Sequence, residues 1–247
     1  MIKKPDNWKI VKKNFVEVAA NKSAEMACVG ASLIIPDPVW KSIFLLAIPL
    51  INVWGNFGVK RCEEYLDYIN KKQNEFDNNV IRTDEFRSFF LSTLERHFKE
   101  SSKRKRKLFR TVLLNFGSSR NIDYDYSTKI LSILDQITFD ELKVVNIWSG
   151  KLQEALVEKN KTLNYSYKKV EEILSSEGAN EHQIYFAFEK DIGKPTFNEL
   201  VQRLRALGNY GLLSIRDTSG VILGDGSEGI HVKITKFGKL FINYINT

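Results

Sequence analysis

The chain has 247 residues, of which 43% are hydrophobic and 27% are charged. These are ordinary values for a globular protein, and they exclude a wholly disordered chain, a collagen-like chain and a multi-span membrane protein. The length allows one large or two small domains, which can be stable without a disulfide or a metal. The formal net charge is +7, and most of it falls in the segment 99–110, which has seven basic residues and one acidic residue.

Cysteine usage and the N-terminus predict a cytoplasmic protein. Cys28 and Cys62 are the two cysteines, and they form neither a CxxC pair nor a zinc-binding pattern. Such sparse cysteine is typical of a reducing, intracellular setting. The first residues include several lysines but no early apolar core with a small-residue cleavage site, so they do not resemble a secretory signal.

The segment 26–59 is unusual, because only Asp37 and Lys41 carry charge within it. It follows an amphipathic helix predicted over 8–24. Its second uncharged run, 42–59, approaches the roughly 20 apolar residues of a membrane helix but contains a proline and several Asn and Gly residues. We favour a buried apolar hairpin in a helical core. The alternative is insertion into a membrane, or docking on a membrane or a protein partner.

Two helices are predicted after this segment. Residues 60–79 have the pattern of a polar helix with a thin apolar stripe. Thr83 is a favourable N-cap for the next helix, and Asp84 and Glu85 suit the positive end of its dipole. The apolar side chains that follow recur at helical spacing and predict a core helix: Phe86, Phe89, Phe90, Leu94 and Phe98.

The basic segment leads into a helix predicted over 99–116, with a break or kink indicated at Ser101 and Ser102. Five consecutive cations, Lys103–Lys107, point in all directions around a helix and cannot share one face. We expect a stripe of four to share an exposed face and to bind phosphates of a nucleic acid or an anionic membrane: Lys99, Lys103, Arg106 and Arg110. The alternative is a solvated face that pairs with nearby acids such as Glu95 and Glu100.

Shorter helices are predicted after a loop at 117–126. They cover 127–134 and 138–148, and a further helix ends at Gly178. Residues from about 150 to 190 are interpreted as an insertion in the C-terminal domain.

The C-terminal region has the clearest pattern. Thr196 and Glu199 form a capping box at the start of a helix. Strands are predicted over 212–216 and 230–234, the second from its alternation of apolar and polar residues. Thr235 then caps a last helix. The order helix, hairpin, helix is typical of a winged helix.

The text RLRALGNYGLLSIRD…HVKITKFGKLFINYI resembles the recognition helix, wing and last helix of winged-helix proteins over about fifty residues. The whole chain also resembles a family of bacterial helical proteins of the domain-of-unknown-function kind, through TDEFRSFFLSTLERHFKE, the Lys/Arg-rich helix and the ending ITKFG. The first resemblance implies a fold. The second brings no catalytic residue. Some members of that family are associated with phage defence, so bacterial phage defence is one expected setting for this protein.

The predicted recognition helix offers residue types that read bases and phosphates on its polar side: Asn198, Gln202, Arg203 and Arg205. We expect these to contact nucleic acid. The alternative is a contact with a protein or a second copy of the chain, which winged helices also make.

The segment Gly224–Gly229 matches the spelling GxGxxG. A dinucleotide site needs a strand before this motif and a helix immediately after it. Here a strand follows, so we interpret the segment as the tip of the wing.

No catalytic, metal or cofactor site is predicted. His97, His182 and His231 are the three histidines, and none belongs to a recognised motif. An enzyme of unrecognised type remains the least favoured class.

Together these patterns predict a mainly α protein with a small β component. A helical domain over 1–126 precedes a winged-helix-like domain over 127–247. The favoured function is a non-enzymatic adaptor or regulator that contacts nucleic acid. The alternative is a membrane-acting effector that inserts or docks through 26–59. A contact with a protein partner or a second copy of the chain is expected at the apolar hairpin or at the winged helix.

Overall fold

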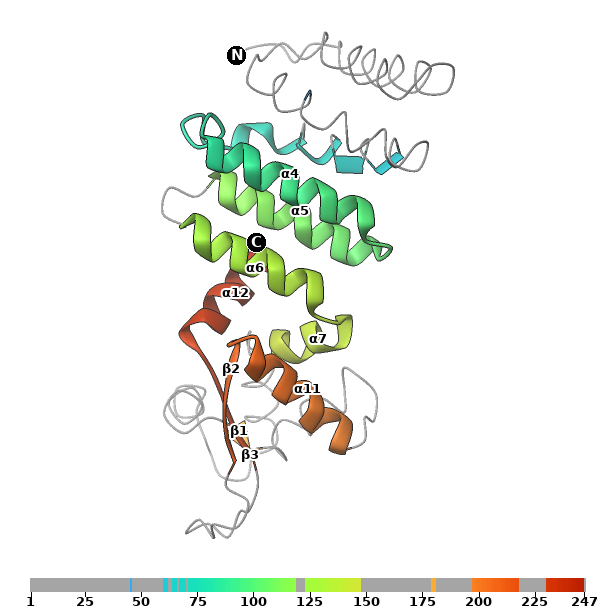
Figure 1. Ribbon diagram of the computed structural model, residues 1–247, viewed down its shortest axis with the longest axis vertical. Helices are drawn as coiled ribbons and strands as arrows, with labels where there is room; N and C mark the ends of the chain where they lie inside the picture. The colour runs from blue at the N-terminus through green and yellow to red at the C-terminus, as the bar shows by residue number, and fades with distance from the viewer. Residues whose placement is uncertain are drawn as a thin grey trace, which may run out of the picture. The chain divides into compact units, whose positions relative to one another are not determined.

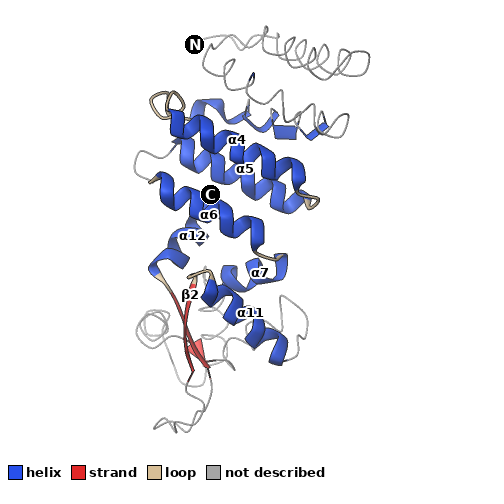
Figure 2. Ribbon diagram, viewed as in Figure 1, coloured by secondary structure: helices blue, strands red, loops and turns tan. Residues whose placement is uncertain are grey.

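The computed structural model describes residues 45, 60–61, 64–65, 67–69, 71–118, 123–147, 179–180, 197–217 and 230–246. They belong to two compact units, residues 1–135 and 136–247. The described residues are mainly helical with one small sheet, which confirms the predicted fold class (Figures 1 and 2). The domain boundary predicted at 126 falls within helix α6 (Tyr124–Gln136), whereas the two units divide after Asp135.

Several predicted features lie outside the described residues. They are the helix over 8–24, the apolar segment 26–59 apart from residue 45, most of the insertion at about 150–190, Thr196 and the glycine motif 224–229. Among the described residues, no helix combines the length and the apolar character that a membrane span requires.

The described residues of the N-terminal unit are mainly helical. Helical residues between 60 and 72 and the short 3-10 helix η1 (Gln73–Glu75) precede α4 (Asp84–Lys99), α5 (Lys103–Ser118) and α6. α4 and α5 are joined by a three-residue turn and lie along each other (Figure 1).

Helix α4 begins and packs as its sequence predicts. The side chain of Thr83 accepts a hydrogen bond from the backbone N–H of Phe86 at 3.1 Å, so the predicted N-cap is confirmed. The five apolar residues expected on its core face are all buried, with exposed fractions of 1% or less.

Aromatic rings hold α4 and α5 together. The rings of Phe86 and Phe116 stack with centroids 6.2 Å apart, and Phe89 lies 4.5 Å from Phe116. Gly117 leaves room for these rings, because a Cβ there would overlap the rings of Phe76 and Phe86.

The described residues of the C-terminal unit form three helices and a sheet. Its elements are α7 (Phe139–Ile147), β1 (Ala179–Asn180), α11 (Phe197–Asn209), β2 (Leu213–Asp217), β3 (Ile230–Ile234) and α12 (Lys236–Asn246). β2 and β3 pair antiparallel with Leu213 opposite Ile234, and β1 adds to the other edge of β3. The predicted hairpin is therefore confirmed, whereas β1 was not foreseen.

Thr235 joins the hairpin to α12. Its hydroxyl donates to the carbonyl oxygen of Gly211 at 2.7 Å and accepts from the N–H of Gly238 at 2.8 Å, so the predicted cap is confirmed. Gly211 has a φ of +74°, a conformation that glycine adopts without strain. At Gly238 a Cβ would overlap the carbonyl oxygen of Leu212, so glycine is needed for this close approach.

Candidate nucleic-acid interface

The structure divides the predicted basic stripe between two helices. α4 ends at Lys99, Glu100 is extended, and α5 begins at Lys103. The hydroxyl of Ser102 accepts from the N–H of Lys105 at 3.4 Å and so caps α5. The break expected at the two serines is confirmed, and the single helix over 99–116 is wrong.

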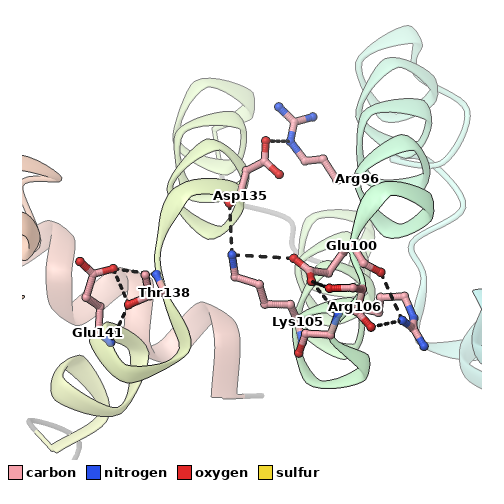
Figure 3. A network of polar contacts seen from close by, with 9 residues as sticks. Arg96, Glu100, Lys105, Arg106, Asp135, Thr138 and Glu141 are labelled. Carbon is pink, nitrogen blue, oxygen red and sulfur yellow. Dashed lines mark hydrogen bonds and ion pairs between the residues drawn. The ribbon is translucent and has the colours of Figure 1, made fainter.

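Arg106 was expected on an exposed face, but it is buried, with 8% of its surface exposed. Its Nη1 donates to the carbonyl oxygens of Glu100 at 3.2 Å and Ser101 at 2.8 Å (Figure 3). Its Nε lies 3.3 Å from a carboxylate oxygen of Glu64. The carbonyls of Glu100 and Ser101 lie between the two helices and outside their hydrogen-bond ladders, so a guanidinium that is directed inward can satisfy them.

A second guanidinium, that of Arg61, donates to carbonyl oxygens at the end of α4. Arg61 is 7% exposed, and its Nη1 donates to the carbonyl oxygens of His97, at 3.5 Å, and Phe98. Sequence reasoning missed both Arg61 and Glu64. Their spacing of three residues places them on one side of a helix, but their targets lie more than thirty residues away, where no local pattern points.

Arg110 also departs from the expected exposed stripe, because it is half-buried. Its Nη1 donates to the carbonyl oxygen of Glu64 at 3.0 Å, and its guanidinium lies 5.2 Å from the ring centroid of Tyr68. Burial lowers the pKa of Arg110, although an arginine remains charged at neutral pH. Two of the four stripe residues therefore serve the interior of the N-terminal unit.

Four cations around the α4–α5 turn are exposed, and we name them the basic turn: Lys99, Lys103, Arg104 and Lys107. The last three lie at i, i+1 and i+4 of α5, within about 100° of one another around the helix. The Nζ of Lys99 lies 2.5 Å from a carboxylate oxygen of Glu95. Lys105 is less exposed than these four, and its Nζ lies 3.8 Å from the carboxylate of Glu100 and donates to the carbonyl oxygen of Asp135 at 3.1 Å (Figure 3).

The two units differ in charge. Residues 1–135 contain 23 Lys and Arg against 16 Asp and Glu, whereas residues 136–247 contain 14 of each. The whole net charge of +7 therefore belongs to the N-terminal unit, where the basic turn lies.

The residues expected to contact nucleic acid on α11 fall on two sides of the helix. Asn198, Gln202 and Arg205 are exposed. Arg203 is turned away from them and lies 3.5 Å from the carboxylate of Asp140, with 25% of its side chain exposed. The polar side that the sequence predicted is present, without Arg203.

An open cleft of about 400 Å³ lies beside Arg203, lined by Thr138, Asp140, Glu141, Glu199, Gln202 and Arg203. A carboxylate oxygen of Glu141 accepts from the N–H and the hydroxyl of Thr138, at 2.6 and 2.8 Å, and this capping box begins α7 (Figure 3). Three carboxyl groups against one guanidinium make the cleft unfavourable for a phosphate.

His97 of α4 is fully buried. Its Nδ1 lies 3.4 Å from the carbonyl oxygen of Arg106, and burial lowers the pKa of His97 to about 3. The ring is therefore neutral at pH 7. In the described part of the chain, no group of three or more His, Cys, Asp or Glu side chains is arranged to hold a metal.

No family model, curated protein or solved structure matches this chain. The geometry of the basic turn and the distribution of charge are therefore the observations from which a function can be inferred.

Proposed function

We propose that the protein is a non-enzymatic nucleic-acid-binding protein whose basic turn contacts phosphates. The observation that carries this proposal is the exposure of four cations around one turn, in a unit that holds the entire net charge. Each phosphate that a cation neutralises releases condensed counterions, so the binding is salt-dependent and independent of sequence.

The C-terminal unit supports a role as an adaptor or regulator. Its order of α11, the β2–β3 hairpin and α12 is the order of a winged helix. In this proposal Asn198, Gln202 and Arg205 add polar contacts from the exposed side of α11, while Arg203 stays with Asp140. The neutral balance of this unit makes it the smaller contributor to phosphate binding.

The test compares two triple variants with equal loss of charge. One replaces Lys103, Arg104 and Lys107 by Gln. The control replaces Lys233, Lys236 and Lys239, which are exposed in the C-terminal unit, by Gln. Binding to labelled duplex DNA and RNA of mixed sequence is measured by fluorescence anisotropy at about 50 to 200 mM salt.

We expect the basic-turn variant to bind more weakly than the parent protein. The slope of log K against log salt should become shallower by about 0.9 for each duplex phosphate that is no longer neutralised. The control variant should keep the parent slope. Equal weakening in both variants would contradict a defined site and leave only a net-charge effect. If the parent protein binds anionic vesicles but neither DNA nor RNA, the result would instead support the membrane-acting alternative.

A further inference from the structure

Buried side chains stabilise the turn between α4 and α5, around which the four cations of the basic turn lie. Four backbone carbonyls at the end of α4 and in the turn, those of His97, Phe98, Glu100 and Ser101, accept hydrogen bonds from only two side chains, Arg61 and Arg106. These arginines come from helices on either side of α4 in sequence.

Two further contacts fix the same turn. A carboxylate oxygen of Glu100 accepts from the N–H of Ser102 at 2.6 Å, which closes the turn from its own side chain. Glu64 holds Arg106 through its Nε at 3.3 Å, so the guanidinium bridges a carboxylate and two carbonyls at once. A planar guanidinium donates from separate nitrogens and can make such a bridge, whereas a lysine ammonium donates from one nitrogen at the end of its chain and cannot replace the Nε contact and the Nη1 contacts together.

We propose that Arg106, supported by Glu64, is a positioning residue for polyanion binding: it sets the shape of the turn that presents Lys99 and Lys103, and it does not itself contact phosphate. This inference rests on the proposed function of the basic turn. The side chain of Arg106 is 10% exposed and its donors are directed to Glu64, Glu100 and Ser101, so its charge is used inside the protein. Cations on a preformed turn lose less freedom on binding, and affinity gains accordingly.

The test uses substitutions that separate shape from charge. Arg106→Lys keeps the charge but cannot make the bridge, and Arg106→Gln removes the charge as well. Arg110→Lys is the matched control, because Arg110 is also an inward-facing arginine of α5 but contacts the carbonyl oxygen of Glu64 and the ring of Tyr68 instead of the turn. All are measured against labelled mixed-sequence duplex DNA over a series of salt concentrations, with thermal unfolding in parallel.

We expect both Arg106 variants to bind roughly tenfold more weakly, the equilibrium equivalent of one hydrogen bond to a charged group. Their salt slopes should equal that of the parent, because the phosphate contacts remain. Arg110→Lys should lower the melting temperature and leave the affinity unchanged. If Arg106→Lys fails to fold, Glu64→Gln weakens the same bridge more gently and should show the same decrease in affinity at an unchanged slope.

Two results would overturn the positioning role while leaving the proposed function intact. A slope that falls by about 0.9 in Arg106→Gln alone would make Arg106 a phosphate contact. A decrease in affinity in Arg110→Lys equal to that in Arg106→Lys would mean that general stability, and not the shape of the turn, controls binding. Parent protein that binds no duplex at low salt would overturn the proposed function and this inference together.

Discussion

Within each unit, backbone groups at a connection between two elements are hydrogen-bonded by a side chain, and the two units use different side chains for this. In the N-terminal unit the turn between α4 and α5 is closed by guanidinium groups of Arg61 and Arg106, which donate to backbone carbonyls. In the C-terminal unit a neutral hydroxyl has this role, with Thr235 bonded to Gly211 and capping α12. These guanidinium groups place positive charge in the interior, where Glu64 pairs with Arg106, so part of the basic content of the N-terminal unit is structural.

The comparison distinguishes the total positive charge of a segment from the part of it that is exposed to solvent. A count over Lys99–Arg110 includes two arginines that face the interior and four cations that face solvent. In the C-terminal unit, Arg203 is paired on the surface with Asp140 and basic and acidic residues balance. An estimate of polyanion binding from sequence must therefore subtract the arginines that the fold uses internally.

The largest expected effect comes from removing an inward guanidinium. Arg106→Met should lower the free energy of unfolding by about 3 kcal/mol, because it removes the ion pair with Glu64 and leaves two turn carbonyls without their guanidinium donor. Chemical denaturation measures this difference. A decrease in the free energy of unfolding of less than about 1 kcal/mol would show that the fold does not need the guanidinium bridge. The two units would then not differ in their dependence on arginine.

Acid should destabilise the N-terminal unit through His97. Its pKa is about 3 in the folded protein and near 6.5 when unfolded, so the unfolded chain takes up the proton first as the pH falls. Stability from this group is present above about pH 6.5 and should decline by roughly 2 kcal/mol between about pH 7 and pH 5. His97→Phe should remove this part of the pH dependence, as denaturation at both pH values would show. Equal pH dependence in parent and variant would contradict a buried, neutral His97.

Much of the fold could be predicted because its signals are local. The phenylalanine spacing of α4, the cap at Thr83 and the alternation of Ile230–Ile234 each depend on neighbouring residues, and each is confirmed. The stripe failed because helical spacing says which cations share a side, not which side the core occupies. Arg106 and Arg110 lie about 40° apart around α5. Glu64, from the helical residues that precede α4, contacts both of them, so this side of α5 faces the interior.

An intermediate effect is expected at the neutral junction of the C-terminal unit. Thr235→Ala should cost about 1 kcal/mol, since it removes the N-cap of α12 and the bond to Gly211. Thr235→Ser keeps the hydroxyl and is the matched control, expected to lie close to the parent in denaturant unfolding. A serine variant as unstable as the alanine variant would assign the effect to the missing methyl group and not to the cap.

The smallest effect is expected at the surface ion pair of the C-terminal unit. Arg203→Met should change the free energy of unfolding by at most about 0.5 kcal/mol, because a partly exposed pair contributes little once solvent screening is included. Asp140 does not lose its only partner, since the Nζ of Lys143 lies 2.9 Å from its carboxylate and holds the pKa of Asp140 below its usual value. Arg205→Met, on the exposed side of α11, is the matched control for the change of side chain. A cost for Arg203→Met near that for Arg106→Met would mean that both units depend on arginine to the same degree. If Arg203→Met and Arg205→Met lower the free energy of unfolding equally and only slightly, then the arginine that stabilises the fold, among the three compared, is Arg106 at the α4–α5 turn.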